Sequence, residues 1–576
     1  MTTTRVIDIE TDGLNPSTIW CAVVNDDVYT SKDTFEFSQE DTYYAHNGIN
    51  FDYPVLHRLW DVPVDPQGPC PDNLRDTLVL SRLACPDRAG GHSLASWGNR
   101  LGFPKGDHSD WSQYTPEMLS YCKQDVQVTT RALEELEREL DGFSEESIQL
   151  EHQVAWIIAQ QERNGWLLDQ RGCFDLLAEL KERKNELEKE VHERFIPVCQ
   201  AVKEVHPRYK KDGGLSSVGL KFLGDEWARL VGGPFTRVDF PDFNLGSRKQ
   251  IAEYLIRFGW KPKNTTDKGN VIVDETTLEG VDIPEAQLIA EYLMIQKRIA
   301  QVQSWLDAVG PDGRVHGRVN PCGAVTTRMT HMEPNMAQVP ASRKPYGKRC
   351  REVWCAPEGY KIVGCDAESL ELVMLAHYMN DDDFIRAVSE GNKDDGTDPH
   401  TVNQRAAGLD TRDQAKTFIY AFLYGAGDAK IGSIVGGGAS DGRRLKGRFL
   451  SRTPALASLR ERVESASRRG YLKGLDGRKL AVRSAHAALN TLLQGGGAIV
   501  MKRALVILDH HIRLRGLDAK FIGNIHDEIQ MEVLEKDAPT VKWLSEASIA
   551  AAGDFYNLRC PLRGSAVIGD TWYETH

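Results

Sequence analysis

The segment RVIDIETDG near the N-terminus places two acidic side chains in a predicted strand. Isoleucines alternate with Asp8 and Glu10, so strand geometry turns both carboxylates to one face and both isoleucines to the other. Carboxylates about 7 Å apart on one face repel each other unless a cation lies between or beside them. The fold must therefore give this strand either a solvated edge or a bound cation.

Two further segments also carry carboxylates that could bind a cation. HNGINFDYPVL carries Asp52, and YCKQDVQVTTRAL predicts a helix with Tyr121 and Asp125 on one face. Together with the first strand they offer four carboxylates and one phenol, a set that would hold two Mg²⁺ or Mn²⁺ ions. Two such ions can activate a water and stabilise the leaving 3′ oxygen of a phosphodiester, and the tyrosine could orient that water.

A second acidic pair lies in the C-terminal half. YKIVGCDAESLELVMLAHYM runs from an apolar strand into a helix, with Asp366 at the junction. FIGNIHDEIQMEV alternates as a strand, which predicts that Asp527 shares the apolar face with Ile525 and Ile529. An unpaired aspartate on an apolar face is costly unless it is protonated or binds a cation. We expect Asp366 and Asp527 to share a metal site; the alternative is an aspartate at a turn or a strand end.

Between these segments, TRDQAKTFIYAFLYGAG predicts a helix whose one face carries Arg412, Lys416, Tyr420 and Tyr424 in turn. Two cations can clamp a polyphosphate, and aromatic rings can stack on a base. The alternative is an amphipathic core helix with snorkelling cations.

The net charge of −13 hides a division along the chain. Residues 1–150 carry 11 basic and 26 acidic side chains, whereas residues 405–520 carry 22 basic and 9 acidic ones. The basic block fits a surface for phosphates, although a solvated helical face would have the same composition.

Composition excludes several other classes. A content of 41% hydrophobic and 27% charged residues excludes whole-chain disorder, and the sequence has no long apolar run or signal-peptide core. Eleven scattered cysteines without a C-x-x-C pair fit a reducing compartment rather than a disulfide framework or zinc ribbon. A Walker A motif is absent, so a P-loop motor or helicase is not expected.

The length of 576 residues predicts three to five domains or lobes. Strands are expected at 5–10 and 19–24, helices over 145–195 and 284–308, and an irregular insert at 196–243.

The N-terminal motifs, in this order, resemble those of DEDDy-type 3′–5′ exonucleases over about residues 1–143. They read Asp8/Glu10, Asn47…Asp52 and Tyr121/Asp125.

The C-terminal motifs resemble motifs A, B and C of family A DNA polymerases, the class of bacterial polymerase I. They read Asp366–Glu371, then Arg412, Lys416, Tyr420, Tyr424 and Gly425, then His526-Asp527-Glu528. The segments TTRMTHMEPNMAQVP, GLDGRKLAVRSAHAALNTLLQG and EYLMIQKR support the match. The closest resemblance is to short phage replicative polymerases, in which an exonuclease precedes the polymerase directly.

This resemblance implies an α+β multidomain fold, with a ribonuclease-H-like exonuclease followed by a right-hand polymerase. The implied regions are the exonuclease (1–143), the thumb and N-terminal polymerase helices (144–310, with the insert), the first palm segment (311–375), the fingers (376–494) and the second palm segment (495–576).

The resemblance also implies residue roles. Metal ligands would be Asp366, Ala367 (through its carbonyl) and Asp527 in one site, and Asp8, Glu10, Asp52 and Asp125 in the other, with two Mg²⁺ per site or Mn²⁺ in its place. Lys416 would donate a proton to the leaving pyrophosphate, and Tyr121 would orient the hydrolytic water. The incoming nucleotide would contact Arg412, His400, Tyr420, Glu371 and Tyr424, with Glu371 excluding a ribose 2′-hydroxyl. The DNA would contact Arg328, His486, Gln494 and His526.

The implied partners are primer–template DNA and dNTPs, a replicative helicase and primase, and host thioredoxin at the 196–243 insert. The implied location is the host cytoplasm if the chain is phage-encoded. Three alternatives remain: a repair or gap-filling polymerase, a single-subunit RNA polymerase and a non-catalytic DNA-binding scaffold. The complete carboxylate sets and the absence of a preceding 5′-nuclease domain favour a replicative enzyme.

Overall fold

The computed structural model of the chain describes residues 3–197, 199–214, 216, 220, 223–228, 230–262, 265–266, 268–274, 277–278 and 281–575. Contacts divide the chain into two compact units. Unit 1 is Met1–Asp169 with Ala308–His576, and unit 2 is Gln170–Asp307. Fewer units separate than the chain length predicts, because the N-terminal and C-terminal segments pack together in unit 1.

The N-terminal region of unit 1 is a five-stranded sheet of order β3-β2-β1-β4-β5. Strands β1, β2 and β3 are antiparallel neighbours, whereas β4 runs parallel to both β1 and β5. The strands are β1 (Thr4–Thr11), β2 (Ile19–Val24), β3 (Asp27–Tyr29), β4 (Thr42–Ala45) and β5 (Leu74–Asp76). The predicted strands at 5–10 and 19–24 are confirmed.

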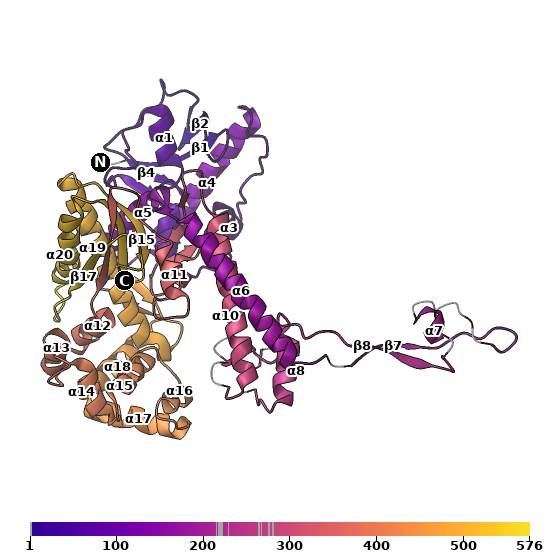
Figure 1. The fold of residues 1–576 in the computed structure, drawn as a ribbon. Coiled ribbons are helices and arrows are strands. Elements are labelled where there is room, and N and C mark those ends of the chain that lie inside the picture. Colours follow the sequence, from indigo (N-terminus) through magenta and orange to yellow (C-terminus); the bar gives the residue numbers. More distant parts are fainter. Residues whose placement is uncertain are drawn as a thin grey trace. The chain divides into compact units, whose positions relative to one another are not determined.

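Four helices accompany this sheet, and α4 packs against β1 and β2 (Figure 1). The helices are α1 (Asp52–Trp60), α2 (Thr77–Ala84), α3 (Leu94–Arg100) and α4 (Pro116–Glu139). Helix α4 begins with an N-cap bond, in which the Thr115 side chain accepts from the Met118 backbone N–H, and with a proline in its first turn.

The C-terminal region of unit 1 is built on a four-stranded antiparallel sheet of order β15-β16-β12-β17. Its strands are β12 (Tyr360–Ala367), β15 (Ala519–Ile525), β16 (Glu528–Leu534) and β17 (Gly564–Gly569). Helix α20 (Ala538–Phe555) packs on this sheet and against α19 (Ala488–Leu514). The apolar side chains between these helices and the sheet belong to a large hydrophobic core that extends into the helical region between β12 and α19.

A helical region lies between β12 and α19 in the sequence. It comprises α12 (Leu370–Met379), α13 (Asp382–Ser389), α14 (Pro399–Ala407), α15 (Arg412–Leu423), α16 (Asp428–Ser433), α17 (Ala439–Arg452) and α18 (Pro454–Ser467). Short elements complete unit 1: β6 (Trp166–Leu167), β9 (Arg314–Val315), β10 (Arg318–Asn320), β11 (Thr330–Met332), α11 (Gly347–Glu352), β13 (Tyr471–Lys473), β14 (Lys479–Ala481) and the 3₁₀ turns Met336–Gln338 and Ala485–Ala487.

Unit 2 pairs two long helices, α6 (Gln170–Arg194) and α10 (Pro284–Asp307). The Arg183 guanidinium donates to both oxygens of Glu291 across this pair, at 2.8 and 3.0 Å. Strands β7 (Gln200–Val205) and β8 (Phe235–Asp239) form an antiparallel ribbon (Figure 1). Among the described residues, helices α7 (Gly224–Ala228) and α8 (Arg248–Arg257) also belong to this unit. Some residues of the predicted insert lie outside the described residues.

The compact second unit starts later than the predicted thumb boundary at residue 144. Helix α5 (Glu145–Asn164) belongs to unit 1, where it packs against β15, α19 and α2. Twelve residues of α5 are buried, including Leu150, Val154 and Trp156. A helix that is buried on most of its circumference must be surrounded by other elements, and unit 1 provides them.

One helical stretch among the described residues, Ala485–Leu514, is long and apolar enough to cross a membrane. In this structure 78% of its most apolar window is buried within the protein, which fits a core helix.

A buried ion network ties α5 to the C-terminal region of unit 1. Glu151, 1% exposed, accepts from Lys502 at 2.5 Å and from Arg478, which also pairs with Asp476 at 2.6 Å. Around the network, Ser144 donates to the Asp476 carbonyl and Arg483 pairs with Asp87 at 2.8 Å. Buried charges of this kind are tolerated only because each has a partner.

We predict that Glu151→Gln destabilises unit 1 by about 3–5 kcal/mol, because removing one partner leaves buried cations uncompensated. Guanidinium unfolding measures this as a lower midpoint. Burial alone would raise the pKa of Glu151, but Lys502 and Arg478 hold it below its ordinary value. The contribution of ionised Glu151 to the free energy of unfolding is therefore complete at neutral pH, and it disappears as the pH falls through the lowered pKa of Glu151. Asp61→Asn, which breaks the exposed pair with Lys32, is the control and should change little. Equal midpoints for both variants would contradict the prediction.

Candidate active sites

Strand β1 carries the first acidic cluster. Asp8 and Glu10 are brought together with Cys122 of α4, and one ligand atom from each of the three lies within 4.8 Å of the others. Glu10 is 5% exposed. The predicted strand alternation therefore turns both carboxylates toward α4, where Glu10 is buried and Asp8 is partly exposed.

The position of Asp52 depends on Asp76, a buried aspartate at the end of β5. Asp76, at the end of β5, accepts from the backbone N–H groups of Asn47 and Ile49 at 2.9 and 3.1 Å. These bonds fix the loop that leads into α1, whose first residue is Asp52. The motif N-x-x-x-x-D is thus held by an acceptor outside the motif.

The pKa values of the cluster reflect burial and mutual repulsion. Burial, followed by the charges of Glu10, Asp52 and Asp125, raises the pKa of Asp8 well above its usual range. Burial raises the pKa of Glu10 to about 9 and that of Asp52 to about 7. Such a group of acids is only partly ionised at neutral pH unless cations compensate it.

Lys105 was not predicted from the sequence, yet its ammonium lies in this cluster. Its Nζ is 2.5 Å from Asp125 Oδ2 and 4.7 Å from the centre of the Tyr121 ring. Burial alone would lower the pKa of Lys105, but the Asp125 charge raises it. The residue lies in an irregular loop between α3 and α4, so no periodicity marks it.

The donor set suits divalent metal ions. Within the described residues, Glu10 Oε1 and Asp125 Oδ1 are buried without a hydrogen-bond partner. Carboxylate oxygens that no protein donor satisfies are the ligands that Mg²⁺ and Mn²⁺ prefer. Asp8, Glu10, Asp52 and Asp125 therefore fit the predicted metal site, and Tyr121 lies beside it on α4.

The second cluster forms where β12 ends beside the β15–β16 hairpin. Asp366 is paired in register with Glu528, and the Ala367 N–H donates to the Asp527 carbonyl at 3.1 Å. Burial, followed by the charge of Glu371, raises the pKa of Asp527. The structure thus brings Asp366 and Asp527 to one edge of the sheet.

The prediction that Asp527 lies within a strand, on a face with Ile525 and Ile529, is wrong. Asp527 lies with His526 in the two-residue turn between β15 and β16, and His526 has a φ of +61°. A two-residue hairpin needs such left-handed backbone, and this interrupts the alternation. Glu528 is buried and accepts from the Trp572 indole at 2.6 Å, which gives it a structural role.

Glu371 lies in the first turn of α12 and is held by two neighbours. Arg328 pairs with it at 3.2 Å and the Tyr424 hydroxyl donates to it at 3.1 Å. Tyr424 caps the C-terminus of α15 and packs beside Tyr420, with ring centres 6.3 Å apart. Glu371 therefore links Arg328 to the C-terminal end of α15.

Helix α15 has the predicted face. Arg412 is in its first turn, where its guanidinium pairs with Asp398 at 2.9 Å, and Lys416 is exposed one turn later. His400, 8% exposed, lies 6.1 Å from the Tyr420 ring. Burial, followed by the charges of Arg412 and Lys416, lowers its pKa. This face presents cations next to aromatic rings.

The residues predicted to contact DNA lie in different parts of unit 1. Arg328 and His526 line one small cavity, together with Met329 and Asn524. His486 lies in a 3₁₀ turn, with its backbone near Gly425, while Gln494 is half-buried on α19.

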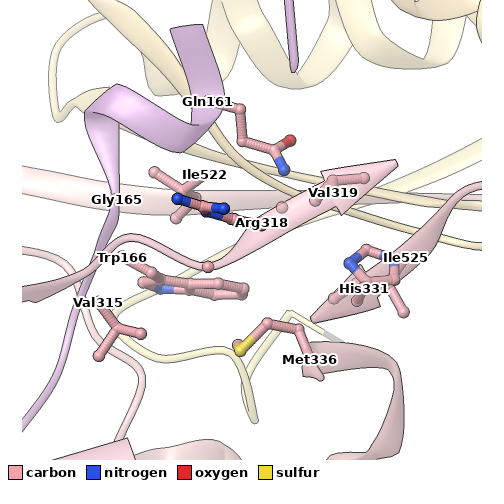
Figure 2. Close-up of a pocket in the computed structure, with 12 residues that line it drawn as sticks. Gln161, Gly165, Trp166, Val315, Arg318, Val319, His331, Met336, Ile522 and Ile525 are labelled. Carbon is pink, nitrogen blue, oxygen red and sulfur yellow. The ribbon is translucent and has the colours of Figure 1, made fainter. Parts of the chain in front are cut away.

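A second small cavity borders the hairpin that carries Asp527 (Figure 2). It is lined by Trp166, Arg318, His331 and Ile525, the residue before His526. His331 is 7% exposed and its Nε2 has no hydrogen-bond partner among the described residues. Burial lowers its pKa to about 4, so it is neutral near pH 7. No periodicity in the sequence singles out this residue.

The sequence profile of DNA polymerase family A matches residues 223–574. The chain belongs to DNA polymerase family A. Two curated relatives, both described as DNA-directed DNA polymerase, come from Enterobacteria phage T3 and Escherichia phage T7. Each is 37% identical, and each match covers 92% of this chain and 92% of the relative.

A solved structure shares the fold of this family A polymerase. It is described as the POL domain of Pol1 from M. smegmatis in complex with DNA primer-template and dNTP. The TM-score is 0.76 at 18% identity, over 99% of this chain and 95% of that one. The predicted α+β fold of a family A polymerase is therefore confirmed.

Proposed function

We propose that this family A DNA polymerase replicates phage DNA and removes mismatched 3′ ends with an exonuclease site of its own. The observation that carries the proposal is the presence of two separate carboxylate clusters in one compact unit. One lies on β1, α1 and α4, and the other on β12 and the β15–β16 turn. One cluster would serve synthesis and the other hydrolysis.

In the polymerase cluster, Asp366, Asp527 and the Ala367 carbonyl would hold two divalent ions, most simply Mg²⁺. When bound, these ions lower the pKa of the primer 3′-hydroxyl and stabilise the pyrophosphate leaving group. Side chains of α15 would contact the triphosphate. Arg412 and Lys416 neutralise the triphosphate, and Lys416 is exposed where it can give a proton to the pyrophosphate.

Nucleotide choice would rest on the residues around Glu371. The Arg328 pair and the Tyr424 bond hold its carboxylate in place. Tyr420 would lie against the sugar and base, with Glu371 filling the space of a 2′-hydroxyl. Arg328 and His526, which share a cavity, would face the minor groove, where acceptor positions are common to all correct pairs.

In the exonuclease cluster, Asp8, Glu10, Asp52 and Asp125 would hold the ions. The Tyr121 phenol, on the helix that carries Asp125, would orient the attacking water. Lys105 pairs with Asp125 and so holds this carboxylate in position. Glu10, Asp52 and Asp125 are buried, so bulk water has little access to these three carboxylates.

We predict that substitutions in the two clusters separate the two activities. Asp527→Ala should reduce primer extension to the level of a reaction without enzyme and leave 3′-end degradation intact. Asp8→Ala should do the reverse, because it removes a ligand from the other cluster only. Each variant is the control for the other, and both are followed on one labelled primer. Primer extension by Asp527→Ala at the wild-type rate would refute the polymerase assignment. Degradation of the 3′ end by Asp8→Ala at the wild-type rate would refute the exonuclease assignment.

We predict that Glu371→Ala raises the incorporation of ribonucleotides relative to deoxyribonucleotides by at least about tenfold, since the side chain no longer fills the 2′ position. Single-nucleotide incorporation with matched NTP and dNTP measures the ratio. Glu368→Ala changes an exposed acid of the same motif and is the control. An unchanged ratio in Glu371→Ala would contradict the steric role.

The segment of residues 195–243, which includes β7 and β8, is a candidate binding surface for a further partner, host thioredoxin. The charge of this segment is nearly balanced, with seven basic and six acidic side chains. Large apolar side chains are nevertheless exposed there: Val202 (54%), Tyr209 (59%), Trp227 (64%), Leu230 (72%) and Phe240 (59%). Exposed apolar groups that lie close together on the surface can mark a binding surface for another protein.

We predict that thioredoxin lengthens the products of single-binding-event synthesis, and that Trp227→Ala combined with Phe240→Ala weakens this response. Trp543→Ala, which removes an exposed tryptophan of α20 instead, should leave it unchanged. If the wild type makes products of equal length with and without thioredoxin, the proposal that thioredoxin is a partner is refuted.

A further inference from the structure

Asp398 is a buried carboxylate between the two helices that carry the proposed triphosphate contacts. It is the N-cap residue of α14, where its side chain accepts from the backbone N–H of His400 at 3.1 Å. His400 Nδ1 is buried and has no hydrogen-bond partner among the described residues, so the backbone of this first turn contributes directly to where the ring lies. The proposed polymerase reaction assigns no role to Asp398.

The same carboxylate holds the guanidinium of Arg412, which begins the neighbouring helix α15. Arg412 Nε and Nη2 lie 3.0 and 2.9 Å from one oxygen, Asp398 Oδ1. The other oxygen, Oδ2, accepts from the Thr401 hydroxyl. One buried group therefore orients the guanidinium and, through the first turn of α14, also places His400.

This contact leaves part of the guanidinium available to a substrate. A guanidinium has five N–H donors, and Asp398 Oδ1 contacts only two of its three nitrogens. The Arg412 side chain is 30% exposed, whereas that of Asp398 is 6% exposed, so the carboxylate occupies the buried side of the pair. The remaining donors can bind phosphate oxygens with the same planar geometry that arginine uses for carboxylates.

A carboxylate near a triphosphate also repels it, so Asp398 must contribute more by ordering its neighbours than it costs by its charge. Burial alone would raise the pKa of Asp398, but the Thr401 hydroxyl and the Arg412 guanidinium hold it below its ordinary value. The carboxylate is therefore ionised at neutral pH, and Lys416, exposed one turn along α15, keeps the net charge of this face positive. A side chain that is fixed before the substrate binds loses less conformational freedom on binding.

We propose that Asp398 is a positioning residue for nucleotide binding, which holds Arg412 and His400 in the arrangement that receives the triphosphate. Asp398 does not touch the substrate and acts only through these two residues. The inference rests on the proposed function, which assigns the triphosphate to Arg412 and His400, and it adds the group that orders them.

The test is single-nucleotide incorporation by the full-length protein at varied dNTP concentration. Asparagine caps a helix about as well as aspartate, so Asp398→Asn keeps the cap of α14 and loses the charged contact with Arg412. We expect its KM for the dNTP to rise at least about tenfold, as for a lost hydrogen bond to a charged group, while kcat changes less than about threefold. In an Arg412→Ala background, Asp398→Asn should raise KM no further, because its target is already absent. Asp398→Ala should still raise it there, because the turn that carries His400 is then uncapped.

The matched control is Asp381→Asn. Asp381 is the N-cap residue of α13, accepts from the Phe384 N–H at 2.8 Å and has no ion pair among the described residues. Its KM should equal that of the wild type. An unchanged KM in Asp398→Asn, or an equal rise in Asp381→Asn, would overturn the proposal. A lower KM in Asp398→Asn would overturn it as well, because the carboxylate would then compete with the triphosphate for Arg412.

Equilibrium binding of the next dNTP on a dideoxy-terminated primer needs no turnover and separates this inference from the proposed function. If Asp398→Asn weakens this binding but the wild type does not extend an ordinary primer, the positioning role stands and the proposed synthesis falls. If the wild type extends the primer and both proteins bind the dNTP equally, synthesis stands and the positioning role falls. Melting curves exclude unfolding as the cause of a raised KM, and Asp398→Ser, which also keeps a capping side chain, replaces Asp398→Asn if that variant melts early.

Discussion

Repulsion between carboxylates that the fold brings close together is the constraint on which both candidate sites depend. In the N-terminal cluster, burial is the main reason that the pKa of Glu10 rises to about 9, and three more acids surround it. The fold can keep such a group only by supplying counter-charge, and Lys105 supplies some of it. The C-terminal cluster follows the same principle with fewer acids, since the pKa of Asp527 is raised by burial and by Glu371. Strand ends are suited to this task because rigid neighbours hold side chains that would otherwise move apart.

The network around Glu151 solves the same electrostatic problem in the opposite way. There a buried carboxylate has permanent cationic partners, Lys502 and Arg478, and its pKa lies below the ordinary value. The acids of the two clusters lack such complete compensation. A carboxylate with fixed partners serves stability, whereas one that still needs a cation is available for chemistry. The difference between the two environments, rather than the number of acids, distinguishes the Glu151 network from the two candidate sites.

Much of this organisation could be predicted from the sequence, because local patterns determine it. The alternation in RVIDIETDG predicts β1, and the spacing of Arg412, Lys416 and Tyr420 predicts one face of α15. Asp527 was misplaced because a two-residue turn preserves the appearance of alternation while reversing the chain. Lys105 and Cys122 could not be found in this way, since only tertiary contacts bring them to β1. The start of the second unit at residue 170 likewise depends on which surfaces cover α5, and that is not a local property.

The joining of both clusters in one compact unit has a consequence for how DNA would be handled. The pair between Arg483 and Asp87 and the bond from Ser144 to Asp476 link the N-terminal and C-terminal regions of unit 1 directly. A primer end that leaves one cluster for the other therefore travels across a fixed frame. If the two clusters act as proposed, that distance would be covered by strand separation and by bending of the nucleic acid. The stability of the last base pairs would then decide between extension and removal.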